Sequence, residues 1–325
     1  MTGENGRFSL AFVHPEPAAE KRRILPLFLP FAGCRRVCLF CAQETQTGRT
    51  QEAVPLILKQ AESRLRDLAG QGPPPEAAFY GGTFTALREE DFAACLSFTR
   101  RMQAAGMIAE ARCSTRPDAV SPALLDRLLA AGFTCVELGV QSFSSAALAG
   151  SGRGYSRETA LAACHMVRRS GLNLGIQLMP GLPGADLEAA TRDVAQAATL
   201  APACVRLYPC LVLEDSGLAS LWRGNLYIPW EEGATLAFLA EACLTLWAAG
   251  VRVIRQGLAP QRSLLSAILA GPWHPALGAR ARGLALALFL ERRLAEAGIV
   301  PGTPLGLDAS RRYQGEFWGH RGELA

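Results

Sequence analysis

The sequence predicts an α/β fold, namely a partial (β/α)6 barrel of the TIM type with a C-terminal extension. Short apolar segments alternate with segments of helical spacing, at intervals of roughly thirty residues, which is typical of βαβ units. Residues suited to chemistry stand where several of the predicted strands end. Because the carboxyl ends of parallel strands form the active face of such folds, this placement favours a partial barrel. A doubly wound open sheet explains the alternation equally well but the placement less well.

Each predicted strand is a short apolar segment that ends at turn residues. The strands are predicted at residues 24–30, 76–80, 111–115, 135–142, 172–179, 204–212 and 251–255. Apolar residues at helical spacing predict the helices. These are expected at residues 51–69, 89–105, 121–132, 156–171, 231–249 and 279–298, with one more that ends near Leu200. Ser121, Pro122 and Ser156 mark helix starts, since serine caps a helix and proline fits its first turn.

The pattern predicts an N-terminal arm at residues 1–23, the barrel at 24–254 and the extension at 255–325. The chain has 325 residues, of which 50% are hydrophobic and 19% charged, as is ordinary for a globular enzyme. Its apolar runs are too short to cross a bilayer, and its first residues lack the apolar segment of a signal peptide. We therefore expect a cytoplasmic protein.

Three cysteines, Cys34, Cys38 and Cys41, follow the first predicted strand as a C-x3-C-x2-C triplet. A closed zinc site takes four ligands, and so does a conventional iron–sulfur cluster. The next cysteine, Cys95, lies far along the chain. Three thiolates on a cluster would leave one iron open for reaction. The other cysteines lie singly in apolar patterns typical of core residues, although Cys204 and Cys210 flank one strand and leave a second ligand pair open.

Further motifs follow the triplet in order along the chain. They are Tyr80–Thr85 (YGGTFT), Ser114–Asp118 (STRPD), Glu137–Ser142 (ELGVQS), Arg153–Tyr155 (RGY), Met179–Gly184 (MPGLPG), Arg206–Pro209 (RLYP) and Gly271–Pro275 (GPWHP). Together they resemble the radical S-adenosylmethionine (radical SAM) superfamily. The resemblance is to the branch that contains the catalytic subunit of elongator and bacterial proteins labelled as like oxygen-independent coproporphyrinogen III oxidase. It covers about residues 24 to 325.

This resemblance implies a 4Fe–4S cluster held by Cys34, Cys38 and Cys41, which are thereby the metal ligands and the catalytic residues. S-adenosylmethionine would chelate the fourth iron, and reductive cleavage would give a 5′-deoxyadenosyl radical. A reductant such as a flavodoxin or a ferredoxin is the implied electron donor. The same resemblance implies a group of cofactor-binding residues, with Arg116 and Tyr208 as weaker candidates for substrate contact. The cofactor-binding group is Phe40, Gly81, Gly82, Thr83, Ser114, Gln141, Ser142, Arg153 and Gln177.

These residues do not determine the substrate. Resemblance to elongator implies RNA, notably tRNA, and basic residues at both ends of the chain could form a modest nucleic-acid surface. Those residues are Lys21, Arg22, Arg23, Arg311, Arg312 and Arg321, with Tyr313 and Trp318 nearby. A small anionic substrate such as a tetrapyrrole is the alternative. Gln43, where tetrapyrrole enzymes of this kind have a fourth cysteine, weighs against it.

Two further points bear on the substrate and on the metal. Arg35 and Arg36 replace a proline-containing pair usual between the first two cysteines, and Ala42 replaces a common asparagine. The added charge favours an anionic substrate. A non-catalytic zinc-binding or RNA-binding module is a third possibility, with His14 or a distant cysteine as the fourth metal ligand.

Overall fold

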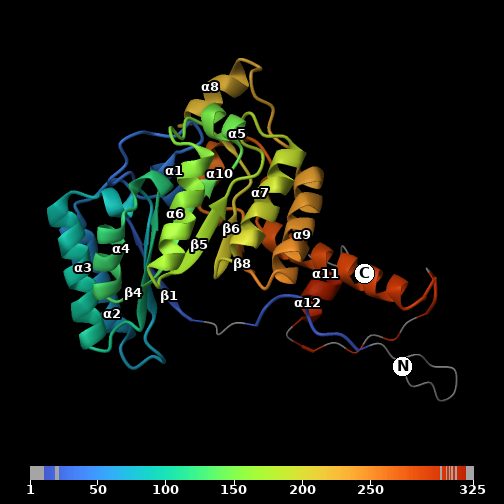
Figure 1. Cartoon of the computed structure of the whole chain (residues 1–325), viewed down its shortest axis with the longest axis horizontal. Helices are drawn as coiled ribbons and strands as arrows, with labels where there is room; N and C mark the ends of the chain where they lie inside the picture. The colour runs from blue at the N-terminus through green and yellow to red at the C-terminus, as the bar shows by residue number, and fades with distance from the viewer. Residues whose placement is uncertain are drawn as a thin grey trace.

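A parallel sheet forms the centre of the molecule in the computed structural model, which describes residues 11–18, 22–300, 302–304, 306, 308, 310–311 and 313–319. Within these residues the sheet has seven strands in the order β1-β2-β3-β4-β5-β6-β8. It curls into a partial barrel, and helices run along its outer face (Figure 1). The partial barrel predicted from the sequence is therefore confirmed.

The strands of this sheet lie close to their predicted positions. They are β1 Ile24–Phe28, β2 Glu76–Tyr80, β3 Glu110–Thr115, β4 Phe133–Gln141, β5 Asn173–Leu178, β6 Cys204–Leu207 and β8 Arg252–Gln256. The helices between them cover the outside of the barrel. They are α2 Val54–Leu68, α3 Glu89–Ala104, α4 Pro122–Ala130, α6 Arg157–Arg169, α7 Leu187–Leu200 and α9 Glu232–Ala248. The predicted caps are confirmed, since Ser121 accepts from the amide of Leu124 and Ser156 from that of Thr159.

Short helices lie at the carboxyl ends of the strands, at the top of the barrel in Figure 1. They are α1 Gln43–Thr47, α5 Ser145–Gly150, α8 Gly217–Arg223 and α10 Arg262–Ala267. The 3-10 turns η1 Phe84–Ala86 and η2 Pro117–Ala119 follow β2 and β3. These elements surround the mouth of the barrel, which is where the sequence motifs meet.

Outward and inward positions of the strands have different chemistry. Outward side chains such as Phe79, Phe133 and Ile176 are almost fully buried in a core shared with the helices. Many inward positions carry polar or charged residues instead, for example Arg112 and Arg206, which line an internal cavity. Because side chains of a strand alternate between its two faces, the sheet separates an apolar shell from a polar interior.

The strand predicted at residues 204–212 was too long. β6 ends at Leu207, and Pro209 lacks the amide hydrogen that a further ladder bond would need. Beyond it, β7 Val212–Leu213 pairs antiparallel with β9 Ile268–Ala270 in a separate two-stranded sheet. The apolar run thus serves two sheets, which periodicity alone does not reveal.

The N-terminal arm and the C-terminal extension meet beside α9, where Glu16, Arg282 and Glu316 also line the internal cavity. Helix α11 Leu277–Glu296 packs along α9, and the short helix α12 Gln314–Trp318 lies against α11. Arg282 of α11 donates to both oxygens of Glu16 at 2.6 Å and also binds Glu316. The boundary at residue 255 stays a prediction. Lys21, Arg312 and Arg321, predicted as part of a basic surface, lie outside the described residues.

His14 takes part in the same terminal contact. Its Nε2 atom lies 3.0 Å from a carboxylate oxygen of Glu316, and its ring stacks on Tyr313 with centroids 4.2 Å apart. The side chain proposed as a fourth zinc ligand is thus bound at the terminal contact. In the described part of the chain, no helix combines the length and the apolar character needed to cross a membrane.

Candidate cluster and cofactor site

One large cavity of about 1420 Å³ lies inside the barrel and reaches the cysteine loop. Its wall is built from inward residues of the strands together with the loop after β1. Cys34, Cys38 and Cys41 all line it, and Gly81 and Gly82 lie on the same wall. The structure therefore brings the triplet and the glycine motif to one cavity, at the carboxyl ends of β1 and β2.

Each thiol of the triplet has a polar neighbour. The Sγ atom of Cys34 lies 3.3 Å from the hydroxyl of Thr83, and that of Cys41 accepts from the Gln43 amide at 3.4 Å. Within the described residues, no three His, Cys, Asp or Glu side chains gather closely enough for a single ion. A cluster places each thiolate on a different iron, so its ligands need not meet at one point.

The thiol of Cys41 is shielded from water. Burial raises its pKa to about 12, and the hydrogen bond from Gln43 opposes that rise. Such a thiol gives up its proton readily only to a bound metal, whose positive charge stabilises the thiolate. The Cys41 thiol therefore fits metal binding better than nucleophilic catalysis.

The Gly81-Gly82 turn is packed against the cysteine loop. Gly82 has a φ of 58°, and a Cβ atom there would lie 2.1 Å from the carbonyl oxygen of Ala32. Only glycine combines this left-handed backbone with such a close approach. The sequence motif thus has a direct structural cause, because the turn holds the loop that carries the thiols.

Gln43 connects three parts of this region and was missed as a functional candidate. Its Oε1 atom accepts from the amides of Phe31 and Gly82 at 2.7 and 2.8 Å. Its Nε2 atom reaches the Cys41 thiol. The side chain therefore ties the start of the loop, the glycine turn and the third cysteine together. Its position two residues after Cys41 was the available sequence signal.

Arg153 is a buried cation beside Cys38. Its side chain donates to the Cys38 thiol at 3.2 Å, to the Tyr155 hydroxyl at 3.0 Å and to the carbonyl of Gly139. The residue is only 4% exposed. Among the described residues it has no carboxylate partner. Since a buried charge without a counter-ion is costly, an anionic thiolate on Cys38 would stabilise this arrangement.

Arg116 is a second arginine beside the Cys38 thiol. It donates to the Cys38 thiol at 3.5 Å and to the carbonyl of Arg153 at 2.5 Å, and Asp118 pairs with it. Two guanidinium groups therefore face one cysteine. Phe40, the aromatic residue before Cys41, is buried and also lines the cavity.

Gln141 ends β4 in a left-handed conformation with a φ of 66°. The pairing with β5 shifts by one residue between Leu138 and Gln141. The side chain lines the cavity, and its Oε1 atom is buried without a hydrogen-bond partner in the structure. Because an unsatisfied buried acceptor is costly, this atom fits a ligand that donates a hydrogen bond, such as a ribose hydroxyl. The residues present therefore fit the cofactor that the sequence resemblance implies.

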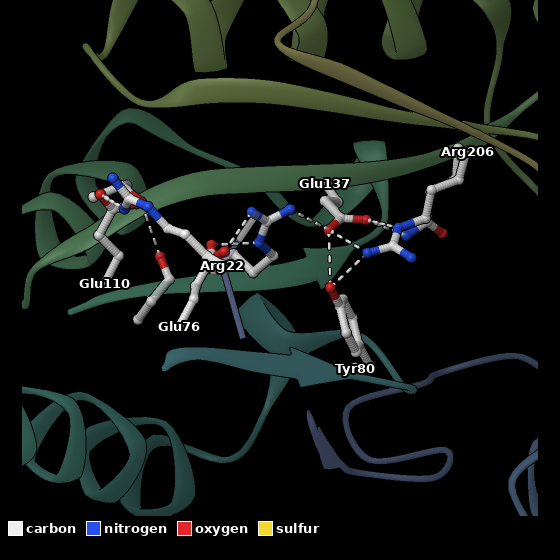
Figure 2. Close-up of polar contacts among 10 residues, drawn as sticks. Arg22, Glu76, Tyr80, Glu110, Glu137 and Arg206 are labelled. Atoms are coloured by element: carbon white, nitrogen blue, oxygen red, sulfur yellow. Dashed lines mark hydrogen bonds and ion pairs between the residues drawn. The ribbon is translucent and has the colours of Figure 1, made fainter. Parts of the chain in front are cut away.

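A network of charged side chains crosses the interior of the barrel. Figure 2 shows Glu137, Arg206 and Tyr80 each in contact with the other two. Arg206 donates to the two oxygens of Glu137 at 2.5 and 3.0 Å and to the Tyr80 hydroxyl at 2.5 Å. Arg112 joins Glu137 to Glu76. Glu137 is 1% exposed, and these arginines hold its pKa down against the effect of burial.

The same network reaches two predicted cofactor residues. Gln177 donates from Nε2 to the hydroxyl of Ser114 and to Glu137, both at 3.1 Å. Ser114 and Gln177 also line the cavity, as does Tyr208, whose hydroxyl lies 3.4 Å from Arg206. Glu137 and Arg206 belong to the ELGVQS and RLYP motifs, but the motifs alone did not predict them as site residues. Their inward position became evident only from the curled sheet.

Ser142 is placed differently from the other predicted residues. Its hydroxyl donates to Asp193 of α7 at 2.5 Å, and the amide of Phe143 donates to the same carboxylate at 2.7 Å. Ser142 is not part of the cavity wall. Ser142 would therefore affect a bound cofactor only indirectly, by fixing the turn that follows Gln141. Asp193, which no motif pointed to, anchors that turn.

Asp193 gives a pH-dependent prediction. Burial raises its pKa to about 6, although both hydrogen bonds oppose the rise. A raised carboxyl pKa means that the folded state takes up the proton first as the pH falls. Its stabilising contribution is thus present at low pH and lost as the pH rises through about 6. We expect the difference in unfolding free energy between wild type and Asp193→Asn to fall by roughly 2–3 kcal/mol from pH 4 to pH 7, in urea titrations. A constant difference would contradict the assignment.

The sequence pattern of the radical SAM superfamily matches residues 28–194. The chain belongs to the radical SAM superfamily. The pattern of the radical SAM C-terminal domain matches residues 202–282. Radical SAM proteins use a 4Fe–4S cluster and S-adenosylmethionine, which confirms the class and the cofactors predicted from the triplet.

Several curated proteins are similar to this radical SAM chain. The tRNA uridine(34) acetyltransferase of Methanocaldococcus jannaschii is 30% identical over 259 residues, which is 67% of this chain and 48% of that protein. Mouse Elongator complex protein 3 is 29% identical, over 59% of this chain and 39% of its own. The heme chaperone HemW of Bacillus subtilis is 24% identical, over 63% and 55%. The chain thus spans about half the length of the curated relatives it matches first.

Solved radical SAM structures share the fold. The archaeal Methanocaldococcus infernus Elp3, with residues 1–46 deleted, superposes with a TM-score of 0.62 at 21% identity, over 86% of this chain and 64% of that one. Coproporphyrinogen III oxidase (HemN) from Escherichia coli gives 0.50 at 21% identity, over 70% and 54%. At this level of identity the likeness concerns the fold of the radical SAM barrel alone.

Proposed function

We propose that this chain is a radical SAM enzyme that acts on a uridine of tRNA. The observation that carries the enzymatic part is the shared cavity, which is lined by three cysteines and by Gln141 with its unsatisfied acceptor. The support for tRNA is the similarity to proteins named tRNA uridine(34) acetyltransferase. Because the chain spans about half the length of those relatives, acetyl transfer is not part of the proposal.

Cys34, Cys38 and Cys41 would hold a 4Fe–4S cluster in this proposal. The chemistry that cluster and S-adenosylmethionine supply when bound is reductive cleavage of the sulfonium bond to a 5′-deoxyadenosyl radical. Arg153 and Arg116 would stabilise the negative charge of the thiolate at Cys38, toward which both donate. A flavodoxin or a ferredoxin would supply the electron.

The cavity wall would hold the cofactor. Phe40 offers an apolar ring, and the buried Oε1 atom of Gln141 would accept a hydrogen bond from a ribose hydroxyl. Arg153 retains donors for the cofactor carboxylate beyond those it uses on protein atoms. Gly81, Gly82, Thr83, Ser114 and Gln177 would complete the wall, and Ser142 would act through the turn that Asp193 holds.

A small anionic substrate is the second candidate. It is favoured by the arginines that line the cavity, among them Arg206, Arg252 and Arg255, and by the similarity to the heme chaperone HemW. A balanced ion-pair network already engages Arg206 with Glu137. RNA therefore remains the better supported substrate.

The test compares the modified nucleosides of tRNA from cells with and without the gene. We expect one uridine-derived nucleoside to disappear from the deletion strain and to return with the wild-type gene. In parallel, the protein reconstituted anaerobically with iron and sulfide should form 5′-deoxyadenosine under dithionite. An unchanged nucleoside profile together with altered porphyrin pools would contradict the tRNA proposal. A colourless protein with one tightly bound zinc and no 5′-deoxyadenosine would overturn the enzymatic one.

A further inference from the structure

We propose that Arg255 and Arg36 form a phosphate-binding pair at the mouth of the cavity, which positions an RNA strand across the opening. The inference rests on the proposed function and names the contact by which the substrate would be held. It starts from an irregularity in β8. Cys204, Val205, Arg206 and Leu207 of β6 pair with Arg252, Val253, Arg255 and Gln256, so that β8 contains one extra residue, Ile254.

This bulge changes the direction of Arg255. In a regular strand, residues 252 and 254 would face the cavity and residue 255 would face the helices. The extra residue instead places Arg255 opposite Arg206, whose side chain lies in the interior. Arg255 accordingly lines the cavity, and it is exposed to solvent. Bulges of this kind often redirect a side chain next to a functional site.

No packing or pairing requirement of the fold explains this direction. Among the described residues, no carboxylate contacts the Arg255 guanidinium, whose nearest polar contact is a weak one with the carbonyl of Gly257 at 3.4 Å. Its neighbour in the sheet is Arg206, a second cation. Glu137 already serves as the counter-ion of Arg206, whereas Arg255 has no such partner among the described residues and stays available to an external anion.

Arg36 offers the same chemistry over the segment between α5 and α6, which follows β4. It stands on the cysteine loop after β1, whereas Arg255 stands on β8, and these two strands are the edges of the sheet. Arg36 is exposed, lines the cavity and contacts no carboxylate in the described part of the chain. Its guanidinium lies over Gly154, where a Cβ atom would come within 2.9 Å of Nη1.

The occupant that fits is a strand of phosphates with a base between them. A guanidinium binds a phosphate through two parallel hydrogen bonds. The same cavity is lined by the aromatic residues Phe28, Tyr80 and Tyr208. Aromatic rings beside arginines are the usual wall for an unstacked RNA base. A nucleic-acid strand carries successive phosphates, so it can engage both arginines at once.

The experiment measures binding of a fluorescent tRNA transcript with uridine at position 34 to the cluster-loaded protein, by anisotropy at several salt concentrations. The test variant is Arg36→Gln/Arg255→Gln. Its matched control is Arg64→Gln/Arg168→Gln, which removes two exposed arginines from the outer helices α2 and α6. We expect the test variant to raise Kd about tenfold or more and to lower the salt slope by about 1.5, since each lost phosphate contact removes about 0.7–0.9. The control should change Kd less than about twofold.

The outcomes separate this inference from the proposed function. The phosphate pair would be overturned if the test variant bound the transcript as tightly as wild type, or if the control variant lost as much affinity as the test variant. Either result would leave the proposed function standing. A wild type that does not bind the transcript would overturn both. If Arg36→Gln lowers cluster content, the single variants Arg255→Gln and Arg255→Lys decide the matter. The lysine variant keeps the charge but loses the paired hydrogen bonds, so its Kd should lie between those of wild type and the glutamine variant, and a glutamine variant that binds like wild type would overturn the pair.

Discussion

Replacing Cys34, Cys38 or Cys41 by alanine is expected to abolish cluster binding and cleavage of S-adenosylmethionine. With three protein ligands available, the loss of one leaves a second iron without a thiolate. Iron content, the brown absorbance of the cluster and 5′-deoxyadenosine formation would be measured after anaerobic reconstitution. All three are expected to fall to background in each variant. A single alanine variant with full 5′-deoxyadenosine production would contradict the ligand assignment.

Cys95→Ala is the matched control for these variants. Cys95 is fully buried in the core between the sheet and α3, well away from the triplet in the chain. The variant should keep its cluster and its 5′-deoxyadenosine formation. It should lose about 1–2 kcal/mol of unfolding free energy, because a small buried side chain is shortened.

Gly82→Ala is expected to prevent cluster loading and to lower the unfolding free energy by about 3 kcal/mol or more. The new Cβ atom would lie 2.1 Å from the Ala32 oxygen and 2.8 Å from that of Leu29, and both are backbone atoms of the cysteine loop. Neither can rotate away as a side chain could, so the loop itself must move. Iron content and urea denaturation would measure the two effects.

Gly171→Ala separates steric displacement from backbone strain. Gly171 has a φ of 87°, and an added Cβ atom there meets nothing within 4 Å. The change should cost about 1–2 kcal/mol through strain alone and leave cluster loading intact. Equal loss of cluster in both glycine variants would show that the contact with Ala32 is not what matters.

The barrel could be predicted because its determinants are local. Apolar segments of strand length, helix caps such as Ser121 and the order of the motifs all appear in the sequence and reappear in the structure. The spacing of the three cysteines and their number were enough to predict a cluster with one iron left open. The class of enzyme was predicted from the resemblance of the triplet and the later motifs to the radical SAM superfamily, and the family match confirms it.

What could not be predicted depends on the register and curvature of the sheet. The extra residue Ile254 gives no sequence signal, yet it turns Arg255 toward the cavity. Ser142 stands beside Gln141 in one motif, but its hydroxyl binds Asp193 on α7. The pairing of Glu137 with Arg206 joins residues far apart in the chain. Such contacts arise from tertiary structure, so periodicity and propensity carry no information about them.

The hydrogen bonds of the cysteine loop have a thermodynamic consequence. The amide of Leu29 donates to Tyr80, that of Cys34 to Phe31 and that of Thr83 to Ala32, so the loop shares its bonds with the end of β2. Its conformational entropy is therefore lost when the barrel folds. Metal capture then proceeds on an ordered scaffold, unlike in a zinc finger, where binding and folding are one event. We therefore expect the barrel to keep its tertiary structure when iron and sulfide are withheld, because these backbone bonds do not involve the thiols.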